Sequence, residues 1–232
     1  MNYTPKNYKM RIVFRWNDGQ TEHPHTLRVI KRMVLDSGLP YEPSKFVSSL
    51  PRLAYGPAPA KGQRAEREYL DIYLLEKCNA DEVRQALLQT APAGFEILQV
   101  TRVPYPLPSV QNLAVAAEYR VKGDFSQFIS SGRKLEDWNS RSDLTVTLRN
   151  EKGVACERTI TPGLLAARVC APDEVALTIG PVNGQWQPPQ WFIAAWLGQE
   201  VPVGEEPVTV AGLVFIRKCF YWRDSHGELH PI

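Results

Sequence analysis

The stretch His23–Asp71, HPHTLRVIKRMVLDSGLPYEPSKFVSSLPRLAYGPAPAKGQRAEREYLD, contains the most specific structural signals in the chain. Pro24 suits the first position of a helix, and apolar residues recur at helical spacing across Leu27–Val34. Gly38 and Pro40 end that pattern, because glycine favours a left-handed helix cap and proline cannot continue the helix. The stretch therefore predicts a helix, a long proline-broken loop and a strand.

Working outward, the flanking segments show strand and helix patterns of their own. Apolar residues alternate or cluster with β-formers in the expected strands, and Asn79 or Asp81 can cap the second helix. The expected elements are strands at 8–16, around 51–55, at 68–75 and at 95–103, with the second helix at 80–90. Together with the first helix they give the order β-α-β-β-α-β, which is the ferredoxin-like order.

The second half begins after a proline-rich segment at 104–110, which predicts a stiff connector. The expected elements after it are a strand at 112–121, a helix at 126–138, a hairpin of 143–149 with 154–160, a strand at 175–180, a helix from Pro188, a strand at 208–218 and a small ribbon of 220–222 with the tail. With one extra hairpin this repeats the first order. We therefore expect an α+β fold with tandem ferredoxin-like halves and antiparallel sheets, at residues 1–103 and 111–232.

Charge is distributed unevenly along the chain. The net charge of the 232 residues is only +2, but residues 1–67 contain twelve Lys or Arg against five Asp or Glu, and residues 104–232 contain twelve against fourteen. A basic N-terminal segment suits a partner that carries phosphates or carboxylates. A basic surface that is simply solvated is the alternative.

Cysteine spacing and hydropathy exclude several classes of protein. The four cysteines form no C-x-x-C pair, so we expect neither an iron–sulfur cluster nor a zinc ribbon, and no cofactor. No signal peptide is recognised, and the longest apolar runs are shorter than a membrane span. The expectation is a cytoplasmic protein that does not bind a membrane.

The candidate binding residues lie in the opening stretch and its loop. Their shared feature is a positive charge that could contact phosphates: Arg28, Lys31, Arg32, Lys45, Arg52, Lys61 and Arg64. Tyr41, Phe46 and Tyr55 lie among them and could stack on unpaired bases. RNA is therefore a candidate partner, whereas nothing predicts DNA binding.

His23 and His25 are the only candidates for catalysis. They flank a proline at a helix start, where an imidazole could act as a general acid or base and free backbone N–H groups could bind an anion. Alternatively, His23 caps the helix and His25 is solvated. As a metal pair they have no third ligand nearby in the sequence, since His226 and His230 lie near the C-terminal end.

A family resemblance rests on His23, Leu27-Arg28, Gly38-Leu39-Pro40, Pro51, Gly62 and Glu68-Tyr69-Leu70-Asp71. With this spacing the chain resembles the radical-SAM-linked domain family of unknown function, found fused to or encoded beside radical-SAM proteins in bacteria. His25 stands where that family has an Asp, and Ser44–Ser49 replaces its Ser-Gln-Gly-Phe-Asn-Pro-like loop. The resemblance implies a radical-SAM protein as partner and no particular reaction.

Two functions of different classes follow. The first is a non-catalytic accessory protein that presents a basic surface to RNA or to a partner protein of a radical-SAM system. The alternative is a metal-independent endoribonuclease similar to the CRISPR-RNA processing enzymes, with His23 or His25 assisting a 2′-hydroxyl. Those enzymes carry a glycine-rich loop near the C-terminus, where this chain has only separated glycines. A protein-interaction scaffold without nucleic acid is a third possibility.

Overall fold

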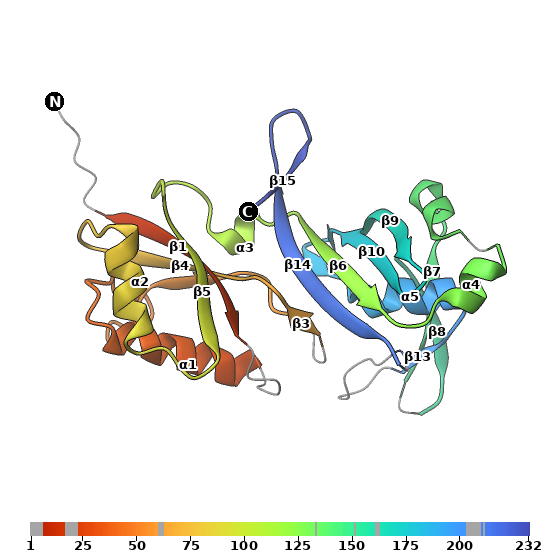
Figure 1. Cartoon of the computed structure of the whole chain (residues 1–232), viewed down its shortest axis with the longest axis horizontal. Helices are drawn as coiled ribbons and strands as arrows, with labels where there is room; N and C mark the ends of the chain where they lie inside the picture. Colours follow the sequence, from red (N-terminus) through yellow and green to blue (C-terminus); the bar gives the residue numbers. More distant parts are fainter. Residues whose placement is uncertain are drawn as a thin grey trace. The chain divides into compact units, whose positions relative to one another are not determined.

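The computed structural model describes residues 7–16, 23–59, 63–132, 134–150, 152–160, 163–202, 210 and 212–232, with the side chains of 23–25 and 202 left out. The chain divides into two compact units (Figure 1). Unit 1 comprises Met1–Ala58 and Arg67–Leu113, and unit 2 comprises Pro59–Glu66 and Ala114–Ile232. Both units combine helices with mainly antiparallel sheets, which confirms the α+β class. Residues 104–110, expected as a connector, belong to unit 1.

Unit 1 is a four-stranded sheet with two longer helices. Its elements are β1 (Tyr8–Trp16), α1 (His23–Asp36), β2 (Leu53–Tyr55), β4 (Glu68–Leu74), α2 (Ala80–Leu88), β5 (Phe95–Val103) and the short α3 (Val110–Leu113). The strands lie in the order β2-β4-β1-β5, and every neighbouring pair is antiparallel. The sequence of elements from β1 to β5 is the β-α-β-β-α-β order expected for the first hundred residues.

The two longer helices of unit 1, α1 and α2, cover one face of its sheet with apolar side chains. The core on this face combines residues of β1, β4 and both helices, including Ile12, Ile30, Ile72 and Leu87. Helix α2 begins with a reciprocal cap, in which Asn79 Oδ1 accepts the backbone N–H of residue 82 and that residue's carboxylate accepts the N–H of Asn79. The cap satisfies two backbone donors that an uncapped helix start would leave free.

The opposite face of the same sheet is also buried, and here the prediction for β1 was incomplete. Alternation along 8–16 distinguishes a face with Arg11 from the apolar face with Ile12, yet Lys9 and Arg11 are buried along with Asp71 of β4. The segment before and within α3 covers them: the Val110 N–H donates to Asp71 Oδ2 at 2.9 Å, and Lys9 Nζ donates to the Leu107 carbonyl. The charged face is therefore part of the interior of unit 1.

Unit 2 contains a larger mainly antiparallel sheet and a smaller mixed one. Its elements are β3 (Arg64–Ala65), β6 (Ala116–Lys122), α4 (Ser126–Ser130), the 3-10 helix η1 (Leu135–Ser140), β7 (Thr145–Arg149), β8 (Ala155–Thr159), β9 (Leu164–Ala171), β10 (Glu174–Ile179), β11 (Pro181–Val182), β12 (Gln185–Trp186), α5 (Pro189–Leu197), β13 (Val201–Pro202), β14 (Val214–Arg223) and β15 (Leu229–Pro231). The larger sheet has the order β15-β14-β6-β10-β9, with β3 parallel to β14. In the smaller sheet, β13-β7-β8, the hairpin of β7 and β8 confirms the expected one.

Several expectations for this half were wrong in detail. The helix expected at 126–138 is divided into α4 and η1, because Gly132 has a φ of +77° that no helix continues through. The strand expected at 112–121 starts only after α3, and the one expected at 208–218 runs as β14 to Arg223. Residues 208 and 209 lie outside the described part. Strand β9 was missed, since its alanines give little β-pattern.

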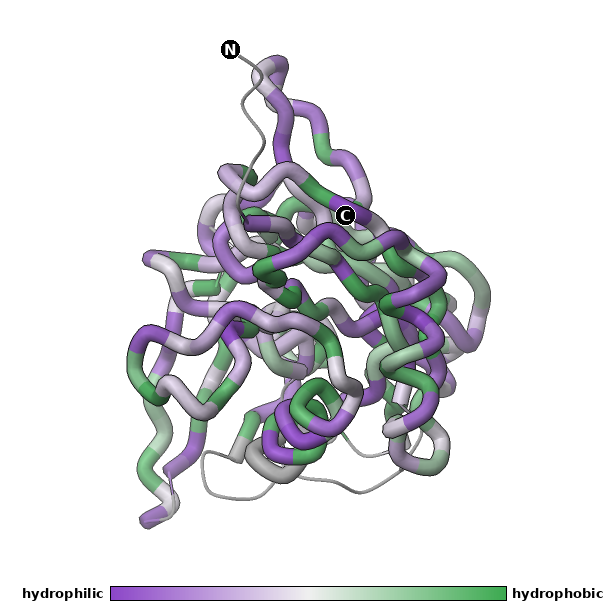
Figure 2. Tube along the Cα trace, turned by 90° about the vertical axis from the view of Figure 1, so that its left-hand side faces the viewer, coloured by the Kyte–Doolittle hydropathy of each residue, from purple (hydrophilic) through white to green (hydrophobic). Residues whose placement is uncertain are grey.

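Aromatic residues pack against α5 in the core of unit 2. Trp196 is buried, with Phe125 and Phe128 at ring-centroid distances of 5.6 and 6.0 Å. Figure 2 shows hydrophobic and hydrophilic residues alternating at short intervals along the trace. Within the described residues, no helix is long and apolar enough to cross a membrane.

Candidate functional site

A hollow of about 350 Å³ lies in unit 1 between α1, β2 and the loop that joins them. We call it the basic pocket. Its lining is Lys31, Ser44, Lys45, Phe46, Leu50, Pro51, Arg52, Leu53 and Tyr55. The volume is at the low end of the ~300–1,000 Å³ that small-molecule sites occupy. The pocket therefore brings three of the expected basic residues to one place.

The loop that forms the rim of the basic pocket is held by its own backbone. The Ser44 N–H donates to the Leu50 carbonyl at 2.8 Å, and the Leu50 N–H donates to the Val47 carbonyl at 3.0 Å. Pro43 and Pro51 form an antiparallel bridge at its base. At the tip, Phe46 is 97% exposed, so the loop carries a large aromatic ring into solvent.

The three cations of the pocket differ in how they are paired. Within the described residues, neither Lys31 nor Lys45 has a salt-bridge or hydrogen-bond partner for its ammonium group. Arg52, in contrast, donates to Glu42 at 2.7 Å and to the Tyr105 hydroxyl at 2.6 Å, and its guanidinium lies 4.0 Å from the centre of the Tyr73 ring. The two lysines are the charges available to a ligand.

Electrostatics agrees with this division. Burial by itself would lower the pKa of Arg52, but the hydrogen bond and charge of Glu42 outweigh it and raise the pKa, so the guanidinium stays charged. Tyr55 is different: burial raises the pKa of its hydroxyl well above the usual value. That hydroxyl has no hydrogen-bond partner among the described residues, which is uncommon for a buried polar group.

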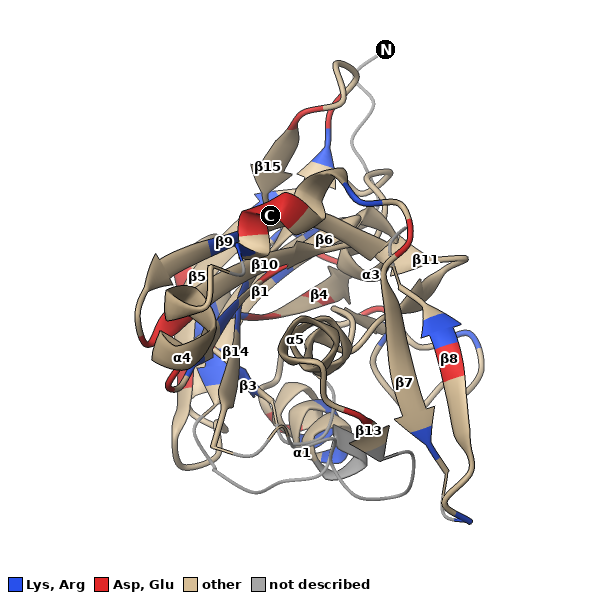
Figure 3. Cartoon of the chain, turned by 90° about the vertical axis from the view of Figure 1, so that its right-hand side faces the viewer, with Lys and Arg blue, Asp and Glu red and all other residues tan. Residues whose placement is uncertain are grey.

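The remaining predicted site residues lie elsewhere. Arg28 and Arg32 are exposed on α1, where Figure 3 colours the Lys and Arg positions of the ribbon blue, and Arg32 pairs with Asp36 one turn on at 2.6 Å. Arg64 is on β3 of unit 2, and Lys61 lies outside the described residues. His23 and His25 fall in the first turn of α1, but their side chains are outside the described part.

A second charged group, which sequence reasoning missed, lies under the segment 104–113. Arg11 donates from Nε and Nη2 to the two oxygens of Asp71 at 2.8 and 3.0 Å. The pair is almost inaccessible, with 8% and 0% of the side chains exposed. We call Lys9, Arg11 and Asp71 the buried charged group. The signal in the sequence that could have indicated this group is the presence of opposite charges, Arg11 and Asp71, within two of the expected strands.

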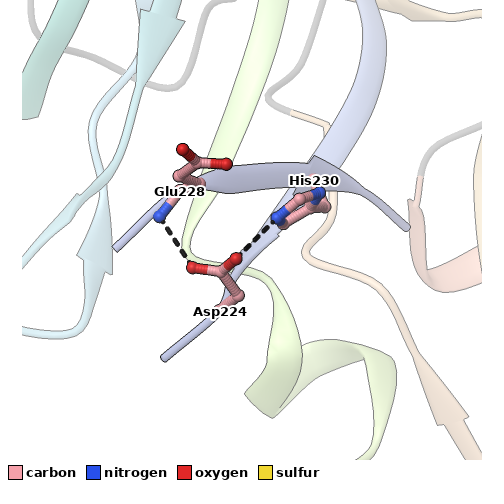
Figure 4. A group of neighbouring side chains, drawn as sticks. All are labelled: Asp224, Glu228 and His230. Atoms are coloured by element: carbon pink, nitrogen blue, oxygen red, sulfur yellow. Dashed lines mark hydrogen bonds and ion pairs between the residues drawn. The ribbon is translucent and has the colours of Figure 1, made fainter. Parts of the chain in front are cut away.

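A third group is on the hairpin of β14 and β15 in unit 2, drawn in Figure 4. Asp224, Glu228 and His230 each offer one donor atom, all within 4.8 Å of one another, so the set could hold a divalent cation. Asp224 is already engaged: Oδ2 lies 2.9 Å from His230 Nε2, and Oδ1 accepts the N–H groups of residues 226 and 228. These bonds lower the pKa of Asp224, with that to His230 the largest cause, and they close the turn.

Comparison with known families identifies the chain. Residues 21–184 match a family described as an uncharacterized protein conserved in bacteria, DUF2344. The chain belongs to this family. The matched range includes the whole basic pocket and Asp71, and it ends before the group at Asp224. No curated protein matches the sequence. The family description names no reaction, and it shows no link to radical-SAM proteins.

Proposed function

We propose that this DUF2344 protein is a non-catalytic binding protein whose basic pocket contacts the phosphates of RNA. The observation that carries the proposal is a pair of ammonium groups without partners among the described residues, those of Lys31 and Lys45, in the pocket that the exposed Phe46 also lines. Positive charges supply most of the affinity for a nucleic-acid backbone, and aromatic rings stack on unpaired bases. An acidic protein segment would use the lysines but would gain little from the ring.

The two units supply a frame that suits such a protein. We propose that both are ferredoxin-like. The order β2-β4-β1-β5 in unit 1 has its counterpart in β9-β10-β6-β14 of unit 2, where α4 and α5 take the places of the two helices and β7 and β8 are the extra hairpin. The sequence suggested halves at 1–103 and 111–232; in the structure β3 belongs to unit 2 and residues 111–113 belong to unit 1.

Binding would not use the open sheet face that RNA-recognition motifs use. In those domains, aromatic residues on a four-stranded sheet stack on bases. In unit 1 the sheet face opposite α1 and α2 carries the buried charged group and is closed by the segment at 104–113. The loop 44–50, whose ring is exposed, is the better position for a single strand.

The partner implied by the family resemblance is a radical-SAM protein. In this proposal the DUF2344 protein holds RNA for that partner, and it does not carry out the reaction itself. Co-purification of a radical-SAM protein with a tagged chain from a bacterium that expresses it would support the association. If no radical-SAM protein co-purifies, either with RNA added or without it, the proposed association is contradicted.

The test of RNA binding is a salt titration with a fluorescein-labelled single-stranded RNA. Each neutralised phosphate contributes about 0.7 to the slope of log affinity against log salt for single strands. Replacing Lys31 and Lys45 together by Gln should therefore flatten the slope by roughly 1.4. Lys77→Gln with Lys152→Gln removes two other exposed charges and is the matched control. Equal effects of the two double variants, or no binding at low salt, would refute the proposal.

The endoribonuclease remains the second candidate from the sequence, because the side chains of His23 and His25 are outside the described part. Incubation of the RNA with the native protein tests it directly. Cleavage that His23→Ala or His25→Ala abolishes, with binding unchanged, would replace the non-catalytic proposal.

A further inference from the structure

We infer that the basic pocket is specific for unpaired nucleotides, with one base stacked on Phe46 and the adjacent phosphates held by Lys31 and Lys45. This inference rests on the proposed function and names the class of ligand more closely. It distinguishes single-stranded RNA from duplex RNA and from polyanions that have no bases. The argument has three steps: the position of the ring, the freedom of the charges and the shape of the loop.

The first step is that only one of the three expected stacking residues is available. Tyr41 forms a backbone bridge to Leu74 and is half-buried, and the Tyr55 hydroxyl is buried. Phe46 is almost fully exposed, although burying its ring would be favourable in water. A planar partner that covers the ring supplies that burial, and every base has such a face.

The second step concerns charge. The ring stands at the edge of a pocket with two cations that have no partner within the described part of the chain, Lys31 from α1 and Lys45 from the loop itself. Arg52 adds a positive charge that Glu42 largely compensates. A strand whose base lies on the loop tip would therefore pass its phosphates between a helix and a loop that both carry free ammonium groups.

The third step is shape. The loop is closed by short-range backbone bonds, from Ser44 to Leu50 and from Leu50 to Val47, which limit how far its tip can move. A loop restrained in this way loses little backbone freedom when a base stacks on its ring. In a duplex the bases already stack on their neighbours, so their faces are not available to the ring. The pocket therefore selects for a base that is out of the stack.

The buried Tyr55 hydroxyl provides a control for the pocket. Tyr55 is one of the lining residues, but its hydroxyl is closed off from solvent and has no hydrogen-bond partner among the described residues. A buried hydroxyl without a partner does not stabilise the free protein. Tyr55→Phe should thus leave the unfolding midpoint of the free protein unchanged or slightly raised, and it should leave the affinity for the oligouridylate unchanged.

The decisive experiment compares three probes, each of ten nucleotides per strand, on the native chain and on Phe46→Ala. The probes are a ten-nucleotide oligouridylate, the same backbone without bases, and a ten-base-pair RNA duplex. Stacking of one base is worth about 1.4 kcal/mol by its typical range, so Phe46→Ala should weaken the oligouridylate about tenfold. The substitution should leave the affinity for the abasic strand and the salt slope unchanged. Val47→Ala removes the neighbouring exposed apolar side chain and serves as the matched control.

The outcomes separate this inference from the proposed function. Loss of binding in the lysine variant with no effect of Phe46→Ala would overturn the inference and leave the proposed function standing. If the native chain binds the duplex or the abasic strand as tightly as the oligouridylate, the inference is also overturned. If the lysine variant and Phe46→Ala both bind every probe like the native chain, both proposals fail.

Discussion

Unit 1 contains two groups of charged side chains that differ in burial and in pairing. In the buried charged group, Arg11 and Asp71 satisfy each other and are closed off from water. In the basic pocket, the ammonium groups of Lys31 and Lys45 have no partners among the described residues. Desolvation explains the difference: a charge can be buried only when it is paired, whereas an unpaired charge must stay in water until a ligand arrives.

The first way to test this comparison is to break the buried pair. Asp71→Ala would leave Arg11 buried without a counter-charge and the Val110 N–H without an acceptor. The free energy of unfolding should fall by about 3–5 kcal/mol, measured by urea denaturation. The RNA affinity of the molecules that remain folded should be unchanged, since Asp71 is not part of the pocket lining.

An exposed pair of the same geometry provides the control. Arg141 donates from Nε and Nη2 to the two oxygens of Asp143 at 3.0 and 3.1 Å, but both side chains are open to solvent. Asp143→Ala should give no measurable loss, because solvent screens such pairs. Similar losses for the two variants would show that burial does not set the value of the pair.

The buried group also shows where prediction from sequence ended. The periodicity of 8–16 and 68–75 identifies both strands, and the capping residues identify both helices of unit 1, because these signals are local. Whether the second face of β1 meets water depends on a segment almost a hundred residues later, which folds back over it. Alternation along one strand cannot report that contact.

The candidate site was predictable to a similar degree. The high number of Lys and Arg residues within 28–64 singled out this segment, and three of these residues line the pocket. It could not tell that Arg52 is paired with Glu42 or that Arg64 belongs to unit 2, because both facts depend on tertiary neighbours. In the second half, boundaries failed where short elements and glycines interrupt the patterns, as at Gly132.

Arg52 lies at the boundary of the two groups and should show both behaviours. Arg52→Gln removes the bonds to Glu42 and Tyr105 and leaves a half-buried carboxylate unpaired, so the protein should lose about 1–3 kcal/mol of stability as well as RNA affinity. Arg52→Lys keeps the charge but loses the planar contact with Tyr73, so most of the RNA affinity should remain. Parallel urea and binding titrations check this. Equal RNA affinities of the two variants would contradict a role for this charge in binding.

The pH dependence of stability sharpens the contrast further. Burial lowers the pKa of Lys9 below 10.5, although the charge of Asp71 opposes this. At pH values between the folded and the unfolded pKa of Lys9, the unfolded chain binds the proton and the folded chain does not. The stability of the native protein relative to that of Lys9→Met should therefore rise as the pH approaches 10.5. Urea titrations of both chains across that range measure the difference. The comparison with the variant cancels the tyrosines that titrate there, and a difference that falls with pH would contradict the burial of a lysine with a lowered pKa.

The smallest expected effect is on the stability of the free protein when the pocket lysines are changed. Lys31→Gln and Lys45→Gln together remove two positive charges for which no partner exists within the described residues, so the free energy of unfolding should change by no more than about 0.5 kcal/mol. Urea denaturation of the double variant measures it. A loss as large as that of Arg52→Gln would mean that these ammonium groups hold the loop in place and are not reserved for a ligand. An unchanged free energy of unfolding with a flattened salt slope is the combination that a binding surface requires, because removal of the charges then affects RNA binding and not folding.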